Sequence, residues 1–546
     1  MKKNRDSKSV KALLNLRVPM RDGVELATHV YMPDSKGPFP VMLTRTPYEA
    51  IGKGAEVLKW PEREYAYVVQ DVRGRFLSDG DFYPWFNEID DAEDTLNWLC
   101  EQPWCNGAVT MYGGSYPGAT QNGAAMTGHP ALKCFTPALI GAEFYHTAYW
   151  GGAFRLSWQI WALNSHEDTN TDELKNKLPL IDLDVIGGEK APYWRDGLAH
   201  PTQDEFWHKC SMAKHFSKIE APAFIRTGWH DLFVCDAFDL YNGLRKKGGT
   251  QQARDHTRIL IGPWPHDINQ SKVGEVDFGL EAVVSDLEKQ ELLFMDYFTA
   301  GREGYDLHAA PIRLFIMGAN KWRDEYEWPL ARTVYTDMFL SSGGNANTAN
   351  GDGVLDKISD GIEDHFEYNP ANPVPTLGGA WDFTNIGSFD QVENESRSDV
   401  LVYTSKKLTS DTEVTGSVEI KLFASSSTRD TDFTAKLIDL TDDNKAMSVT
   451  DGIIRARYRR LDGSEELLTP GEVYEFSIQC NPTSYLFQKG HRIRLEISSS
   501  NFPAFSRNLN TGGEIATETK IVIAEQKIYH TADYPSKILL PIILAR

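Results

Sequence analysis

Residues 111–118, Met-Tyr-Gly-Gly-Ser-Tyr-Pro-Gly, place a serine inside a glycine-rich turn. The apolar residues before it are typical of the end of a buried strand, and Pro117 with the small residues after it suits the start of a tightly packed helix. Such a turn exposes a serine hydroxyl for nucleophilic attack, and glycines permit its strained geometry. The hydrolase pattern G-x-S-x-G is met with its last glycine one position late. Ser115 is therefore a candidate nucleophile, with an ordinary turn as the alternative.

A serine nucleophile needs a histidine base and a carboxylate, and in this kind of fold they follow in the order Ser, Asp, His. Residues 221–231 read as an apolar strand that breaks at Gly228 and presents Asp231 on the loop beyond it. Residues 258–266 repeat the pattern, with a short apolar strand, a Gly-Pro break and then His266. Both polar residues thus follow the carboxyl ends of strands, where open α/β sheets place their sites.

With these and other motifs, the chain resembles the cocaine esterase-like (CocE/NonD) serine hydrolases, which are relatives of X-prolyl dipeptidyl-peptidases and α-amino acid ester hydrolases. The resemblance implies a triad of Ser115, Asp231 and His266. It also implies an oxyanion hole made by the Tyr48 hydroxyl and the backbone amide of Tyr116, and acyl transfer that needs no metal or organic cofactor. The motifs are Arg45-Thr-Pro-Tyr48, Asp71-Val-Arg-Gly-Arg75, the Ser115 turn, Gly228-Trp-His-Asp231, Gly262-Pro-Trp-Pro-His266 and Met317-Gly-Ala-Asn-Lys-Trp-Arg323.

Each of these residues also has a plain structural interpretation. Asp231 is suited to capping a helix that starts at Leu232, and His230 beside it is a competing imidazole. His266 is one of 14 histidines, and Tyr48 fits a core position with a satisfied hydroxyl. Taken together, three residues in the catalytic order at strand ends favour the catalytic interpretation.

The composition fits a large enzyme. A chain of 546 residues, 41% of them hydrophobic, exceeds a single core and divides into two or three domains. Its net charge of −21 argues against nucleic acid or an anionic membrane as a partner. The N-terminus lacks the apolar core of a signal peptide, and the six cysteines show no disulfide framework, so we expect free thiols and a cytoplasmic location.

The order of the expected elements predicts an α/β-hydrolase fold, a mostly parallel sheet with helices on both faces. We assign 1–142 and 216–310 to it, 143–215 to an inserted helical cap and 311–546 to a β-sandwich, which the resemblance makes a jelly roll. The clearest expected elements are strands at 25–32, 41–44, 66–70, 417–423, 433–438 and 492–497, and helices at 88–102 and 287–298.

The cap sequence is rich in aromatic residues at helical spacing, which is typical of core packing. The resemblance implies that some of them line the acyl pocket. We expect Trp150 first and Phe154 second in this role, together with Phe233, which lies two residues after Asp231.

Two departures from the relatives bear on the substrate. The hydrolase strands are expected from about residue 24, which leaves no room for the additional N-terminal structure of the peptidases. The acidic pair of amino acid ester hydrolases is absent after Asp231, and only Asp236 remains. We therefore expect a small-molecule carboxylic ester with a bulky, uncharged acyl group. The alternative enzymes are an X-Pro dipeptidyl-peptidase and an α-amino acid ester hydrolase or acylase. The alternative outside the enzymes is a catalytically inactive binding module. The sequence leaves open whether the protein forms a homo-oligomer.

Overall fold

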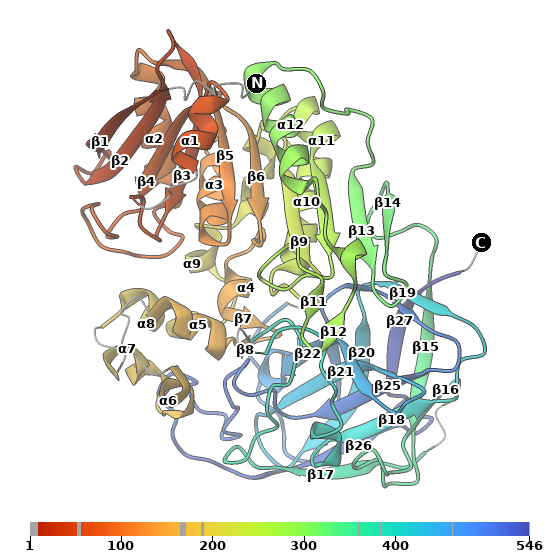
Figure 1. The fold of residues 1–546 in the computed structure, drawn as a ribbon. Coiled ribbons are helices and arrows are strands. Elements are labelled where there is room, and N and C mark those ends of the chain that lie inside the picture. Colours follow the sequence, from red (N-terminus) through yellow and green to blue (C-terminus); the bar gives the residue numbers. More distant parts are fainter. Residues whose placement is uncertain are drawn as a thin grey trace.

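The computed structural model describes residues 9–51, 56–163, 171–186, 190–358, 361–382, 385–460 and 462–544. Figure 1 shows three parts: a sheet flanked by helices, a group of short helices inserted between two of its strands, and a β-rich part that ends the chain. This is the arrangement expected from the sequence.

A ten-stranded sheet forms the first part, in the order β1-β2-β4-β3-β5-β6-β9-β10-β13-β14. The pairs from β4 to β13 are parallel, and β1, β2 and β14 join antiparallel at the two edges. Parallel neighbours require long crossover connections, which the helices supply. The strands are β1 Val10–Pro19, β2 Glu25–Pro33, β3 Phe39–Thr46, β4 Ala66–Asp71, β5 Cys105–Gly114, β6 Leu132–Ala138, β9 Phe224–Gly228, β10 Arg258–Gly262, β13 Ile312–Ile316 and β14 Lys321–Glu325.

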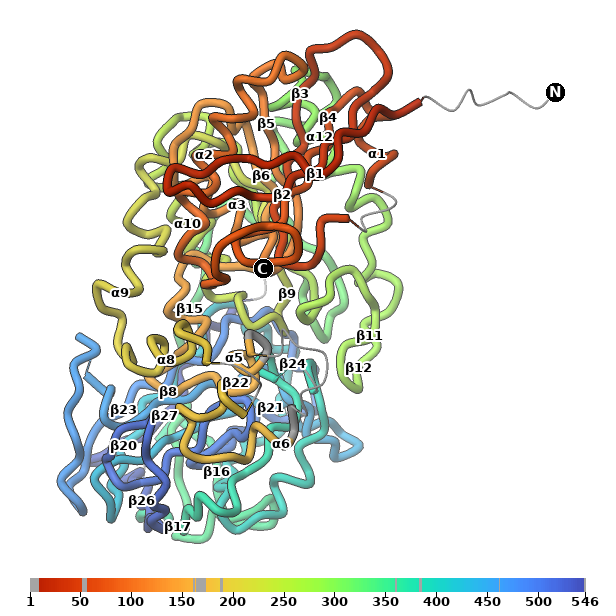
Figure 2. Tube along the Cα trace, turned by 90° about the vertical axis from the view of Figure 1, so that its left-hand side faces the viewer, coloured from red at the N-terminus to blue at the C-terminus, as the bar shows by residue number. Residues whose placement is uncertain are grey.

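Helices cover both faces of this sheet because its central strands are apolar on both sides. Val41 and Leu43 of β3 belong to the same core as α2, α3 and α10, whereas Met42 between them packs in the core with α1 and α12. Successive side chains of a strand point to opposite faces, so β3 serves both cores. Figure 2 shows α2 and α10 on one side of the strands and α1 and α12 on the other. The helices are α1 Glu56–Glu62, α2 Glu88–Glu101, α3 Tyr116–Met126, α10 Val234–Lys247, α11 Gln251–His256 and α12 Leu287–Ala300.

A helical cap is inserted between β6 and β9, as expected. Its core contains Leu156, Leu183 and Trp194, all almost fully buried. The elements are α4 Tyr145–Ala148, the hairpin β7 Tyr149–Trp150 and β8 Ala153–Phe154, α5 Leu156–Leu163, α6 Thr171–Asn176, α7 Leu183–Ile186, α8 Pro192–Ala199 and α9 Glu205–His208, with short 3₁₀ turns at 180–182, 212–214 and 216–218.

The third part is a thirteen-stranded β structure with a core of its own, which includes Leu422, Leu495 and Ile538. Its strand pairs are antiparallel except for β16 with β18. The strands are β15 Thr333–Ser341, β16 Val354–Asp356, β17 Asp364–Tyr368, β18 Leu401–Ser405, β19 Thr412–Gly416, β20 Glu419–Ser426, β21 Asp432–Leu440, β22 Ala446–Arg455, β23 Tyr474–Gln479, β24 Thr483–Phe487, β25 Arg492–Ser498, β26 Ala524–Tyr529 and β27 Lys537–Ile543.

The first sheet is wider than the sequence patterns indicated. Strand β1 was not expected before residue 24, because an edge strand is mostly exposed and its apolar pattern is weak. Strands β13 and β14 lie beyond residue 310, yet β13 pairs in parallel with β10 and so extends the first sheet. Among the described residues, no helix is both long and apolar enough to cross a membrane.

Candidate active site

Ser115 occupies the turn between β5 and α3 with a strained backbone. Its φ of 59° and ψ of −127° lie in a region that side-chain-bearing residues rarely adopt. Its amide donates to Ala138 O at 2.9 Å, and its carbonyl accepts from the amide of Gly118 at 2.8 Å. A Cβ at Gly113 would lie 2.5 Å from Pro117 Cβ, so the glycine is required for the turn to close. The strain is therefore held in place by the strand on one side and the helix on the other.

Ser115, His266 and Asp231 form a continuous chain of hydrogen bonds. His266 Nε2 lies 2.9 Å from Ser115 Oγ, and His266 Nδ1 lies 2.6 Å from Asp231 Oδ2. The other carboxylate oxygen of Asp231 accepts from the backbone amide of Phe233 at 2.9 Å. Asp231 is fully buried, and the His266 side chain is 14% exposed. The carboxylate is thus fixed and shielded, while the serine end of the chain remains accessible.

Parallel strands bring these three residues to one edge of the sheet. Ser115 follows β5, Asp231 follows β9 and His266 follows β10, and the carboxyl ends of parallel strands meet at the same edge. The loops after β9 and β10 touch at Gly228, where a Cβ would lie 2.0 Å from the Trp264 carbonyl oxygen. This contact is possible only for glycine, and it brings Asp231 within reach of His266.

Tyr48, on the loop after β3, completes the group. Its hydroxyl hydrogen-bonds with the Ser115 side chain and with the backbone of Tyr116. Burial raises the pKa of Tyr48, and these two hydrogen bonds offset the rise only in part. The hydroxyl therefore stays protonated at neutral pH and remains a donor. The Tyr116 ring points elsewhere, because its hydroxyl donates to Glu88 at 2.8 Å.

Aromatic rings flank His266, but only one of them was expected. The Phe233 ring lies 5.9 Å from the imidazole, and the Trp158 ring of α5 lies 5.7 Å from it. The two rings meet edge to face at 5.4 Å. Trp158 was missed because helical spacing alone does not show which cap aromatic turns toward the sheet.

The two cap residues expected in this pocket have other recorded contacts, and their role in the pocket stays a prediction. Phe154 packs against Tyr149 and Trp194 in the cap core. The Trp150 ring packs against Trp381 of the β-rich part, and its indole N–H donates to the carbonyl of Gln479 at 3.2 Å. Both lie on the short hairpin β7–β8, and these contacts account for their burial.

Other titratable groups near the triad are committed elsewhere. His230 is buried, its ring Nδ1 lies 2.8 Å from Pro263 O, and burial lowers its pKa to about 4. It is therefore no base for Ser115. Asp236 pairs with His146 Nδ1 at 2.6 Å, and Glu143 accepts from Ser211 Oγ at 2.6 Å. Over the described residues, no group of three or more His, Cys, Asp or Glu is placed to hold a metal ion.

A second Ser-His-Asp cluster in the β-rich part has the wrong geometry for catalysis. Ser342 Oγ donates to Asp364 Oδ1 at 2.7 Å, and the same ring nitrogen of His530, Nε2, lies 2.8 Å from Asp364 Oδ2 and 3.3 Å from Ser342 Oγ. The imidazole therefore does not relay a proton from the serine on one nitrogen to the carboxylate on the other. All three residues are buried. Asp364 gathers these hydrogen bonds as a structural acceptor, and no substrate reaches the serine.

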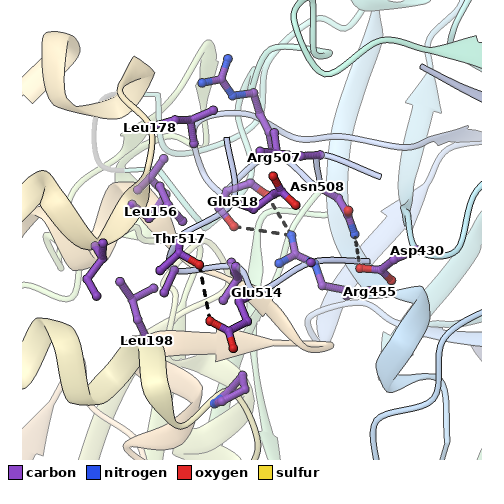
Figure 3. A pocket seen from close by; sticks show the side chains of 18 of the residues that line it. Leu156, Leu178, Leu198, Asp430, Arg455, Arg507, Asn508, Glu514, Thr517 and Glu518 are labelled. Carbon is purple, nitrogen blue, oxygen red and sulfur yellow. Dashed lines mark hydrogen bonds between the residues drawn. The ribbon is translucent and has the colours of Figure 1, made fainter. Parts of the chain in front are cut away.

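A cavity of about 710 Å³ lies between the cap and the β-rich part, away from the triad. Figure 3 shows its two walls: Leu156, Leu178 and Leu198 come from the cap, and Arg455 and Asp430 from the β-rich part. Many of its charges are already paired, as in the 2.8 Å bond between Arg457 and Asp430. Ser115, Asp231 and His266 do not line it.

Comparison with known proteins places this geometry in context. Residues 22–267 match the model of X-Pro dipeptidyl-peptidase (S15 family), and residues 308–539 match that of the X-Pro dipeptidyl-peptidase C-terminal non-catalytic domain. A cocaine esterase of Rhodococcus sp. (strain MB1 Bresler) is 37% identical over 97% of this chain and 98% of its own length.

Two solved structures are similar over almost their whole length. An aminopeptidase from the marine sediment archaeon Thaumarchaeota archaeon superposes with a TM-score of 0.84 and 25% identity, covering 98% of this chain and 97% of its own. An α-amino acid ester hydrolase superposes with a TM-score of 0.83 and 25% identity, with the same coverage.

The strained turn predicts an unusual response of stability to substitution at Ser115. Glycine tolerates the observed backbone angles, so Ser115→Gly relieves strain of about 1–3 kcal/mol, against an entropic cost of about 0.5–1 kcal/mol. We expect the free energy of unfolding of Ser115→Gly to exceed that of Ser115→Ala by about 1 kcal/mol. Urea denaturation of the two variants measures the difference, and a more stable alanine variant would contradict the strain.

Proposed function

Because the chain belongs to the cocaine esterase-like serine hydrolase family, we propose that it hydrolyses carboxylic esters through an acyl-enzyme on Ser115. The observation that carries this proposal is the hydrogen-bonded chain from Ser115 through His266 to buried Asp231, on a strained turn whose serine also meets the Tyr48 hydroxyl. The order of these contacts, from serine to imidazole to carboxylate, is the one that acyl transfer requires.

In the proposed first step, Ser115 Oγ attacks the ester carbonyl carbon while His266 Nε2 takes the hydroxyl proton. Asp231 accepts the Nδ1 proton of the imidazole, which fixes its tautomer and stabilises the imidazolium. The tetrahedral intermediate then collapses, the bond to the leaving oxygen breaks, and His266 returns the proton to the departing alcohol. In the second step water attacks the acyl-enzyme by the same route and releases the acid and free Ser115.

The Tyr48 hydroxyl and the Tyr116 backbone amide are the proposed oxyanion donors. Their mutual hydrogen bond and the contact of Tyr48 with Ser115 support this role, because the donors converge beside the nucleophile. A preorganised donor acts mainly when negative charge develops on the carbonyl oxygen, and one such donor contributes about 3–4 kcal/mol to the transition state in comparable sites.

We propose an uncharged acyl group as the preferred substrate feature. Phe233 and Trp158 beside His266 offer an apolar surface to the acyl chain. Asp236 and Glu143, the acids best able to receive an ammonium group, are bonded to His146 and Ser211. An unpaired cation beside the rings would lose hydration without compensation.

An aminopeptidase-like or amino acid ester hydrolase activity is the second candidate. The similarity to an aminopeptidase and to an α-amino acid ester hydrolase favours it, as do the matches of residues 22–267 and 308–539 to X-Pro dipeptidyl-peptidase models. The same triad would serve both candidates, so the choice between them rests on how the site receives a free amino group.

The nucleophile is tested by covalent labelling. A fluorophosphonate should label the wild-type protein on Ser115 alone, and Ser115→Ala should lose both labelling and the hydrolysis of a short-chain aryl ester. Peptide mass spectrometry locates the label. Hydrolysis that survives in the alanine variant, or a label on Ser342, would overturn the proposal.

The oxyanion role of Tyr48 predicts a selective loss of turnover. Tyr48→Phe removes one hydroxyl and keeps the ring, so kcat should fall by about 10²–10³ while KM changes little. Steady-state kinetics with an aryl ester gives both constants, and circular dichroism controls for folding. A raised KM with unchanged kcat would instead make Tyr48 a residue that binds the ground state.

The substrate class is decided by a direct comparison on one preparation. We expect aryl esters with neutral acyl chains to have much higher kcat/KM than matched α-amino acyl esters or Xaa-Pro dipeptidyl amides, because Asp236 and Glu143 are already bonded to His146 and Ser211. A preference for the substrates with a free amine would select the second candidate function.

A further inference from the structure

Arg155 is a fully buried cation at the junction of the cap with the other two parts. It lies between β8 and α5, and its backbone amide donates to Ala148 O at 2.8 Å. One guanidinium nitrogen donates to the carbonyl of His146, whereas Nε and Nη2 have no hydrogen-bond partner among the described residues. A guanidinium group in such surroundings is costly unless its charge acts on something nearby.

Aromatic rings surround the guanidinium group. Its central carbon lies 5.0 Å from the Trp381 ring and 6.0 Å from the Phe233 ring. Phe233 in turn lies 5.9 Å from the His266 ring, and its amide bonds Asp231. One phenyl ring therefore separates the charge of Arg155 from the proposed catalytic histidine.

No described carboxylate pairs directly with Arg155. Asp236 is bonded to His146 and Asp231 to His266, and both act on Arg155 only through longer-range attraction. Burial lowers the pKa of Arg155 to about 10, although the attraction of the two carboxylates opposes this shift. The guanidinium group therefore remains charged at neutral pH. Its positive field reaches the wall of the acyl site through a medium that contains little water to screen it.

We propose that Arg155 is a specificity-determining residue that disfavours acyl groups bearing a positive charge and favours neutral or anionic ones. The inference rests on the proposed esterase function and supplies a physical cause for its substrate class. Phe233 forms the apolar surface that the acyl chain meets, and Arg155 sets the electrostatic potential behind that surface.

The size of the effect follows from Coulomb's law. Two unit charges about 10 Å apart, in a medium of effective dielectric constant about 20, change an equilibrium by roughly tenfold. An ester whose acyl chain carries an ammonium group should therefore have about tenfold lower kcat/KM than the neutral ester because of Arg155. An ester that carries a carboxylate there should have a kcat/KM higher by a similar factor.

The test compares three esters with one leaving group and acyl chains of equal length that end in an ammonium, a methyl or a carboxylate group. Arg155→Gln should raise the kcat/KM ratio of cationic to neutral ester about tenfold and lower that of anionic to neutral ester. Arg155→Lys retains a basic group on a shorter side chain and is the matched control, so its ratios should lie closer to those of the wild type than the ratios of Arg155→Gln do.

A purely structural role of Arg155 gives a different result. Arg155→Gln would then lower kcat/KM for all three esters by one common factor, and unchanged ratios would overturn the inference.

If Arg155→Gln does not fold, boronic acids with the same three chain ends are measured as inhibitors of the wild type, and tightest binding of the cationic one overturns the inference. Fluorophosphonate labelling of Ser115 separates these outcomes from a failure of the proposed function.

Discussion

A short backbone contact between two loops determines the geometry of the site. The amide of Trp229 donates to Gly262 O at 2.9 Å, and that of His230 donates to Trp264 O at 3.0 Å. These bonds join the loop that carries Asp231 to the loop that carries His266, and Gly228 allows the close approach. Because parallel strands end at one edge, two hydrogen bonds and one glycine are enough to align a carboxylate with an imidazole.

The residues at strand ends and Phe233 were predictable, whereas the cap aromatic beside His266, Trp158, was not. Ser115, Asp231 and His266 each follow a short apolar run and a glycine, and such a signal is local to the sequence. Trp158 and Phe154 both lie in the aromatic-rich cap sequence, and only the docking of the cap determines that Trp158 meets His266. Docking depends on contacts distant in sequence, and no local periodicity reports them.

The β-rich part has no residue in the triad, yet it positions the cap that closes the site. Ser157 of α5 donates its hydroxyl to Asp382, and its amide donates to Pro503 O at 3.1 Å. The Trp381 indole, against which Trp150 packs, donates to Asp451 at 2.9 Å. Helix α5 also carries Trp158, so the third part of the fold influences the acyl surface through the cap.

Chemistry and selectivity thus depend on different parts of this fold. Ser115, Asp231 and His266 are positioned by backbone bonds at the edge of one sheet, where Gly113 and Gly228 leave no room for a side chain. The groups proposed to meet the acyl chain are Trp158 of the cap and Phe233 just before α10, and the charge of Arg155 beside Phe233 is balanced by attraction to Asp236 and Asp231. A change in that balance alters which acyl group is favoured without moving Ser115 or His266. On this inference, selectivity can change through buried charges while the geometry of the triad stays the same.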